Sequence, residues 1–113
     1  MRELYLPQER RIDQVKVVEY LLHPVKGHGK AHLFHKLGFT LLGWELLRDA
    51  LLAHAEALPV TEAVASEFGT KYIVDGGLVT PDGRTPLPIV RAVWIQDTGQ
   101  NGVRLVTAFP VRS

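Results

Sequence analysis

The chain has 113 residues, a net charge of +1, 46 % hydrophobic residues and 22 % charged residues. This size and balance are typical of one folded domain with its own core, and they exclude a disordered chain. Because the sequence has no cysteine, disulfides, thiolate nucleophiles and zinc–thiolate sites are excluded. No apolar run approaches the roughly 18 residues of a membrane span, so we expect a cytoplasmic protein with no membrane partner.

The first half of the chain has the apolar spacing of helices. Over residues 13–22, Val15, Val18 and Leu22 recur at helical intervals, and Asp13 can cap the start. Residues 24–29 combine a proline with two glycines, which predicts a loop.

Two further helices are predicted before Pro59. A short one over 30–37 would end at Gly38, a residue suited to a left-handed helix cap. A longer one would be capped by Thr40 and stopped by Pro59. The apolar faces would contain Leu33, Phe34 and Leu37 in the short helix, and Trp44, Leu47, Leu51 and Ala55 in the long one.

After Pro59 the pattern becomes that of strands separated by turn residues. The expected strands are Val60–Glu67, Thr70–Val74, Leu78–Thr80, Leu87–Asp97 and Val103–Phe109, with a hairpin turn at Asp75-Gly76-Gly77.

This order predicts an α+β fold, in which two or three N-terminal helices pack on one face of a C-terminal antiparallel sheet of about four strands. The helical part would cover about 13–58 and the sheet about 60–110 of a single domain over 1–113.

The segment between Glu19 and Glu45 contains no acidic residue but four of the five histidines. Imidazoles near neutrality can transfer protons, and ammonium groups can hold phosphate. The candidate acid–base residues are His28, His32 and His35, and the candidate phosphate-binding residues beside them are Lys26 and Lys30.

Three interpretations of this segment stay open: a solvated basic face, an anion site and a metal site. A metal is disfavoured because no carboxylate or thiolate lies nearby to complete its ligands, and we expect no cofactor. His54 stands apart in the long helix and is expected at the surface or half-buried, without a chemical task.

The strands provide a second candidate surface. Because side chains alternate along a strand, Arg91 shares a face with Val93, and Arg104 with Val106 and Ala108. If the registers align, Lys71, Arg91 and Arg104 form a stripe of phosphate-binding cations, to which Trp94 or Tyr72 could add stacking. The alternative interpretation places Trp94 in the core and leaves each cation in solvent or paired with a carboxylate.

Several motifs together resemble a family of small, functionally uncharacterised bacterial domains, found alone or at the end of toxin-like chains. They are Tyr20-Leu21-Leu22-His23-Pro24, Gly29-Lys30-Ala31, Leu37-Gly38-Phe39, Phe68-Gly69-Thr70-Lys71-Tyr72, Thr80-Pro81-Asp82-Gly83-Arg84, Val93-Trp94-Ile95 and Leu105-Val106-Thr107-Ala108-Phe109-Pro110. The order of elements is also similar in topology to the barnase, colicin and RelE group of metal-independent ribonuclease toxins.

Two hypotheses of different class follow. The histidine and lysine cluster favours a ribonuclease-toxin-like scaffold for metal-independent RNA cleavage, or for RNA or phosphate binding. The modest net charge favours instead a non-catalytic module that binds a small protein partner or forms a homodimer through an exposed strand or sheet face.

Overall fold

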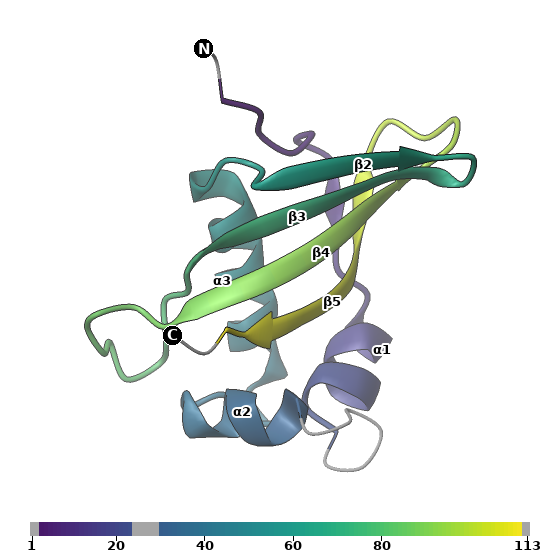
Figure 1. Cartoon of the computed structure of the whole chain (residues 1–113). Coiled ribbons are helices and arrows are strands. Elements are labelled where there is room, and N and C mark those ends of the chain that lie inside the picture. The colour runs from purple at the N-terminus through teal and green to yellow at the C-terminus, as the bar shows by residue number, and fades with distance from the viewer. Residues whose placement is uncertain (1–2, 24–29, 112–113) are drawn as a thin grey trace.

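The computed structural model describes residues 3–23 and 30–111, and it is an α+β fold built on one five-stranded sheet. The sheet has the order β1-β5-β4-β3-β2 (Figure 1). Its strands are β1 (Arg10–Arg11), β2 (Glu62–Ser66), β3 (Gly69–Gly77), β4 (Ile89–Asp97) and β5 (Val103–Pro110).

The sheet is mostly antiparallel, as the sequence predicts, but it has one strand more than the four expected. Strands β2 to β5 form an antiparallel meander, and β1 pairs in parallel with β5 at the far edge. A two-residue strand has no periodicity to reveal it in the sequence. The pairing depends on Gly102, because a Cβ there would lie 2.7 Å from the Glu9 carbonyl oxygen.

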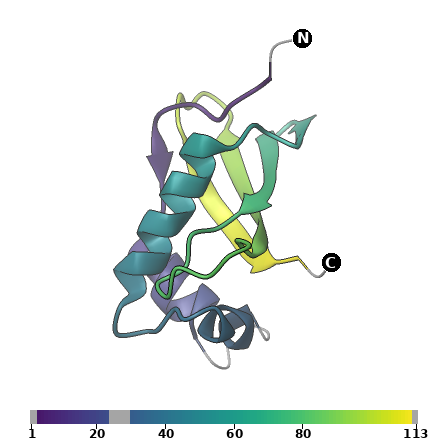
Figure 2. The same cartoon turned by 90° about the vertical axis from the view of Figure 1, so that its left-hand side faces the viewer.

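The helical part contains α1 (Gln14–Lys16), which continues directly as the π-helix η1 (Val17–Leu21), then α2 (Lys30–Lys36) and α3 (Trp44–Ala57). The expectation that these helices pack on one face of the sheet holds in part. Helix α3 lies across one face, whereas α1, η1 and α2 lie at the end of the sheet beside β5 (Figures 1 and 2).

The first helix buries the predicted face only in part. Leu22 is buried as predicted, together with Val17 and Leu21, whereas Val15 is 67 % exposed. The π-turn adds a residue to the helical turn and so rotates the apolar face away from the 3.6-residue period. Asp13 precedes the helix without a capping side-chain hydrogen bond.

Helix α3 packs the face that its spacing predicts, with Leu47, Leu51 and Ala55 fully buried. It begins four residues after Thr40 instead of directly at that cap. Thr40 Oγ1 accepts a hydrogen bond from the Gly43 amide at 3.2 Å, so it stabilises the turn before the helix.

His54 is 3 % exposed, so the expectation of a surface or half-buried residue is wrong. Its Nε2 lies 3.0 Å from the Val90 carbonyl oxygen and 3.2 Å from that of Gly76. Since carbonyls only accept, Nε2 carries the proton and ties α3 to β3 and β4. Burial lowers the pKa of His54, against the opposing effect of these two hydrogen bonds.

Strand β3 continues through Asp75-Gly76-Gly77, where the sequence predicts a hairpin turn. The two glycines provide space instead: a Cβ on Gly76 would lie 2.3 Å from Leu58, and one on Gly77 would lie 2.8 Å from Leu87. The predicted strand Leu78–Thr80 is therefore part of a long connection to β4. A two-residue hairpin turn lies earlier in the chain, at Glu67–Phe68 between β2 and β3.

The connection between β3 and β4 holds α2 in place. Arg84 donates a hydrogen bond to the Lys36 carbonyl at the end of α2 at 3.0 Å, and its guanidinium also contacts Asp82. The Arg84 and Thr80 hydrogen bonds hold the pKa of Asp82 well below its usual range. Gly38 ends α2 with a φ of +96°, as its predicted capping role requires.

The core lies between α3 and the sheet and extends toward η1 and α2. It contains Val17, Leu21, Phe34, Phe39, Leu47, Leu51, Val74, Leu78, Val90, Ala92, Trp94, Leu105 and Ala108.

Candidate functional site

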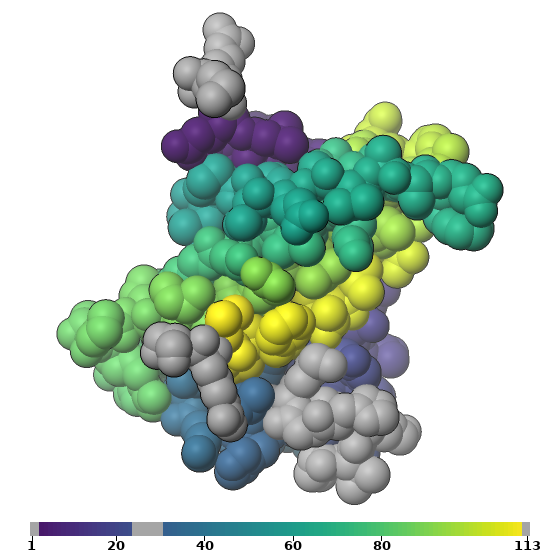
Figure 3. Space-filling view, viewed as in Figure 1, coloured from purple at the N-terminus to yellow at the C-terminus, as the bar shows by residue number. Residues whose placement is uncertain are grey.

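The face of the sheet turned away from α3, here called the outer face, is not covered by any helix of the described residues (Figures 1 and 3). Residues paired directly across antiparallel strands share a face. The rows that contain the fully buried strand residues, such as Tyr72–Trp94–Leu105 with Trp94 at its centre, belong to the covered face. The outer face therefore contains the alternate rows Val64–Lys71–Ile95–Arg104, Glu62–Ile73–Val93–Thr107 and Asp75–Arg91–Phe109.

The three strand cations Lys71, Arg91 and Arg104 all lie on this outer face. Lys71 and Arg104 are in the same row, one on each side of Ile95. The prediction that Arg104 shares a face with Ala108 is wrong. A bulge in β5, opposite Val93 and Trp94, shifts the alternation of side chains between the two faces. Ala108 is consequently buried on the covered face.

Two of these three cations have carboxylate partners. Arg91 contacts Asp75 through Nε and Nη2, both at 2.8 Å. Arg104 contacts Asp97 at 2.9 and 3.2 Å. The Arg104 guanidinium lowers the pKa of Asp97, and Asp75 raises that of Arg91. Lys71 is exposed and has no ion-pair partner among the described residues.

Apolar side chains fill the space between these charges. The row residues Ile73, Val93, Ile95 and Phe109 are all half-buried, although no part of the core packs against them. Val64, Ile89 and Val111 extend the apolar strip at its margins with larger exposure. Contiguous apolar surface of this kind is typical of an interaction site.

The aromatic residues that were candidates for stacking do not share the outer face. Trp94 is fully buried beneath α3, as the core interpretation predicts. Tyr72 pairs with Trp94 on that same side, and its hydroxyl donates a hydrogen bond to Gln96 at 3.1 Å.

The predicted acid–base residues that the structure describes lie on α2, away from the outer face (Figure 1). His32 and His35 are both exposed, while Ala31 and Phe34 form the buried side of the helix. His35 Nδ1 donates a hydrogen bond to the Phe39 carbonyl at 2.8 Å, so this ring stabilises the turn after α2.

The remaining predicted residues of this segment are described only in part. Lys26 and His28 lie outside the described residues. Lys30 is the first residue of α2. Among the residues that the structure describes, no three histidine or carboxylate side chains are grouped so that they could hold a metal ion.

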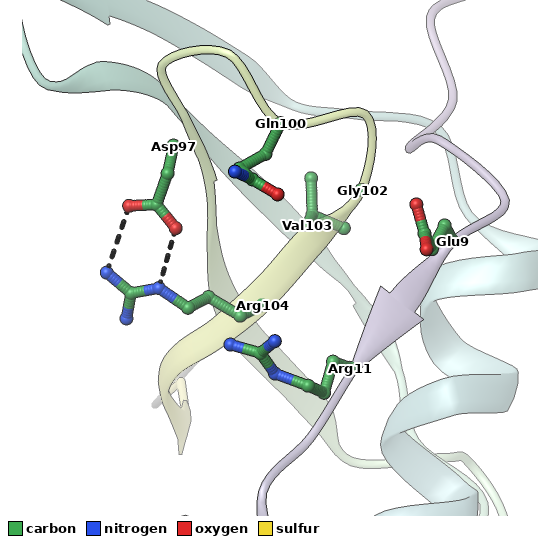
Figure 4. Close-up of a pocket in the computed structure, with 7 residues that line it drawn as sticks. All are labelled: Glu9, Arg11, Asp97, Gln100, Gly102, Val103 and Arg104. Atoms are coloured by element: carbon green, nitrogen blue, oxygen red, sulfur yellow. Dashed lines mark hydrogen bonds and ion pairs between the residues drawn. The ribbon is translucent and has the colours of Figure 1, made fainter.

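A recess of about 410 Å³ lies at the edge of the sheet where β1 meets β5 (Figure 4). Its charged lining residues are Glu9, Arg11, Asp97 and Arg104. Sequence reasoning missed Arg11, because its position next to Arg104 results from the parallel β1–β5 pairing. The recess combines both signs of charge, and Arg104 already contacts Asp97 within it.

The family model described as "Domain of unknown function (DUF6883)" matches residues 6–112. No curated protein is significantly similar to the chain. A chain in the solved structure of a contact-dependent growth inhibition toxin–immunity protein complex from Klebsiella pneumoniae 342 has a TM-score of 0.68 and 13 % identity, over 90 % of this chain and 93 % of that chain. At this identity the likeness shows the fold alone. No helix within the described part of the chain could cross a bilayer.

Proposed function

We propose that this chain, which belongs to the DUF6883 family, binds a small protein partner on the outer face of its sheet, as one member of a toxin–immunity type of pair. The observation that carries the proposal is the uncovered apolar strip of Ile73, Val93, Ile95 and Phe109, bordered by the ion pairs Asp75–Arg91 and Asp97–Arg104 and by the exposed Lys71.

The chemistry of this surface fits protein better than RNA. Protein interfaces have an apolar centre and a polar rim, which is the arrangement of Ile95 between the Asp75–Arg91 and Asp97–Arg104 pairs. A nucleic-acid surface needs an excess of cations free for phosphate and aromatic rings on which bases stack. On the outer face the arginines are neutralised, and Trp94 is buried on the other side.

The solved structural neighbour supports the same proposal. It is a complex of two proteins, a toxin and its immunity protein. A fold of this kind therefore occurs where a small protein is held by a specific partner. The likeness does not assign this chain to either role.

A second candidate function is RNA or phosphate binding with metal-independent cleavage, in which His28, His32 and His35 supply acid and base. One observation favours it: Lys71 and Arg104 lie in the same row of an open sheet face. Another observation argues against RNA cleavage at this face. Helix α2 lies beyond β5, whereas Lys71 is on β3, so the described histidines of α2 are on the opposite side of β5 from Lys71 (Figure 1).

The first experiment measures partner binding by calorimetry, with the small proteins encoded next to this chain as probes. We expect Ile95→Asp to weaken binding by about ten-fold or more, because a charge would be buried at the centre of the interface. Val15→Asp is the matched control, since Val15 is an exposed aliphatic residue on α1. Equal affinities of the two variants would overturn the proposal.

The second experiment distinguishes a protein-binding module from a ribonuclease. Total RNA is incubated with the protein in the presence of a chelator, in parallel with the variants His32→Ala and Lys71→Ala. Our proposal expects intact RNA in every sample. Cleavage that both variants reduce would establish the nuclease in place of the pure binding module.

A further inference from the structure

Strand β2 is an edge strand without the usual protection against pairing. All five of its residues are exposed, and among the described strands it pairs with β3 alone. Figure 1 shows no other strand or helix beside β2. Proteins commonly protect such edges with charged side chains, especially lysine, with proline or with a bulge. Glu62–Ser66 has no lysine, proline or bulge, its one charge is at its first residue, and its central residues Ala63, Val64 and Ala65 are small or β-branched.

The hairpin that carries β2 is held in a fixed shape. Ser66 Oγ donates to the Gly69 carbonyl and accepts from the Phe68 amide, both at 3.2 Å. Thr98 Oγ1 donates to the Glu67 carbonyl at 3.2 Å. A Cβ on Gly69 would lie 2.2 Å from the Gln96 carbonyl oxygen, so the hairpin also needs glycine where it approaches β4. The turn therefore displays Phe68, which is 73 % exposed, in a defined position.

We propose that the occupant of this edge is a second copy of the chain, whose β2 pairs antiparallel with the first around a two-fold axis at Val64. Such a pair joins two five-stranded sheets into one and satisfies the unpaired backbone groups of both edges. A two-fold interface needs a surface that is complementary to itself, and the sequence of β2 has this property.

The complementarity follows from the positions on either side of Val64. In this register Glu62 lies opposite Ser66 of the second copy, and Ala63 lies opposite Ala65, so no like charges meet. Val64, at 43 % exposed, meets its own equivalent on the outer face.

Apolar side chains also lie just beyond both ends of β2. Phe68, in the turn after the strand, is 73 % exposed, and Leu4, whose carbonyl accepts a hydrogen bond from the Val60 amide before the strand, is 53 % exposed.

This inference does not depend on the proposed function. Because paired strands keep their faces, the two outer faces would lie on the same side of the joined sheet. A dimer would then present two partner surfaces side by side, each with its own Ile95.

The test is the molar mass in solution, measured by light scattering and sedimentation equilibrium over a range of concentrations. We expect the 12.6 kDa chain to double its mass as concentration rises. Val64→Lys alone and Val64→Glu alone should each stay monomeric, because like charges would face each other across the axis. An equal mixture of the two variants should regain the dimer. Val15→Lys is the control with a cation on an exposed aliphatic position of α1.

Three outcomes would overturn the proposal. A wild-type chain that stays monomeric at every concentration would do so, and so would dimers that persist in both single variants. Open-ended association would also contradict it, because a two-fold interface closes after two copies. If the monomer binds the small protein partner and Val64→Lys alone abolishes that binding, the edge belongs to the partner's strand instead.

Discussion

The two faces of the sheet use the same strands for different tasks. On the face beneath α3, Ala92 and Trp94 are fully buried in the same core as the helix residues Leu47 and Leu51, and Tyr72 is half-buried beside Trp94. On the outer face, the rows through Ile95 and Arg91 are equally regular, but their side chains contact only each other and solvent. Stability of the fold is therefore concentrated on one face, and the other is free to bind.

The largest expected difference is between two adjacent residues of β4. Trp94→Ala should lower the free energy of unfolding by about 3–5 kcal/mol, because a large side chain is removed from a packed core. Ile95→Ala, on the outer face, should cost about 1 kcal/mol or less. Chemical denaturation of both variants measures the contrast. Similar losses would show that the outer face also contributes to the core.

The next effect concerns pH and the covered face. His54 is buried with its Nδ1 unpaired, and burial lowers its pKa below the ordinary 6.5 although Asp75 acts in the opposite direction. The unfolded chain then binds a proton more readily than the folded one. Stability is complete above pH 6.5 and falls as the pH decreases from there toward the folded-state pKa, by up to about 1.4 kcal/mol per pH unit.

Denaturation between pH 7.5 and 5 in wild type, His54→Gln and His32→Gln tests this pH dependence. We expect His54→Gln to be less stable at neutral pH but to lose much of the slope. His32→Gln is the matched control, a histidine replaced at an exposed position of α2. An unchanged slope in His54→Gln would assign the pH dependence to other groups.

The sequence predicts the covered face better than the outer one. The helical spacing of Leu47, Leu51 and Ala55 predicts α3, and a run of β-branched residues predicts β4. Both patterns lie within a single element, so the sequence alone reveals them. The π-turn of η1 escapes prediction because it departs from the 3.6-residue period, and the two-residue β1 because it depends on pairing with the distant β5.

The outer face could be predicted only as a set of cations on alternate strand positions. Their carboxylate partners could not, because the Asp75–Arg91 pair exists only if β3 continues through Asp75. The sequence predicts a hairpin turn at that point, which would have removed Asp75 from the sheet. The glycines that suggested the turn serve instead to let Leu58 and Leu87 approach the strand.

A smaller effect is expected from an outer-face ion pair. Arg91→Gln should reduce stability only slightly, because the pair with Asp75 lies at the sheet surface and both side chains are partly exposed. The loss should shrink further in high salt, which screens exposed charges. Thermal unfolding in low and high salt measures it. A large loss that persists in salt would show that this pair stabilises the fold as a buried contact does.

The smallest expected effect concerns the Arg104–Asp97 pair on the outer face, and it is measured as a change in the pKa of the Asp97 carboxyl. Arg104 hydrogen-bonds Asp97 and lowers its pKa, with a weaker contribution from Arg11 across the β1–β5 recess. Folding is therefore favoured above the ordinary aspartate value of 3.8, and this contribution is lost as the pH falls through the folded-state pKa. Carboxyl NMR titration should show the Asp97 pKa rising in Arg104→Gln, rising less in Arg11→Gln and unchanged in Arg91→Gln, since Arg91 pairs with Asp75. A larger rise in Arg11→Gln than in Arg104→Gln would mean that the recess, and not the cross-strand pair, holds the carboxylate.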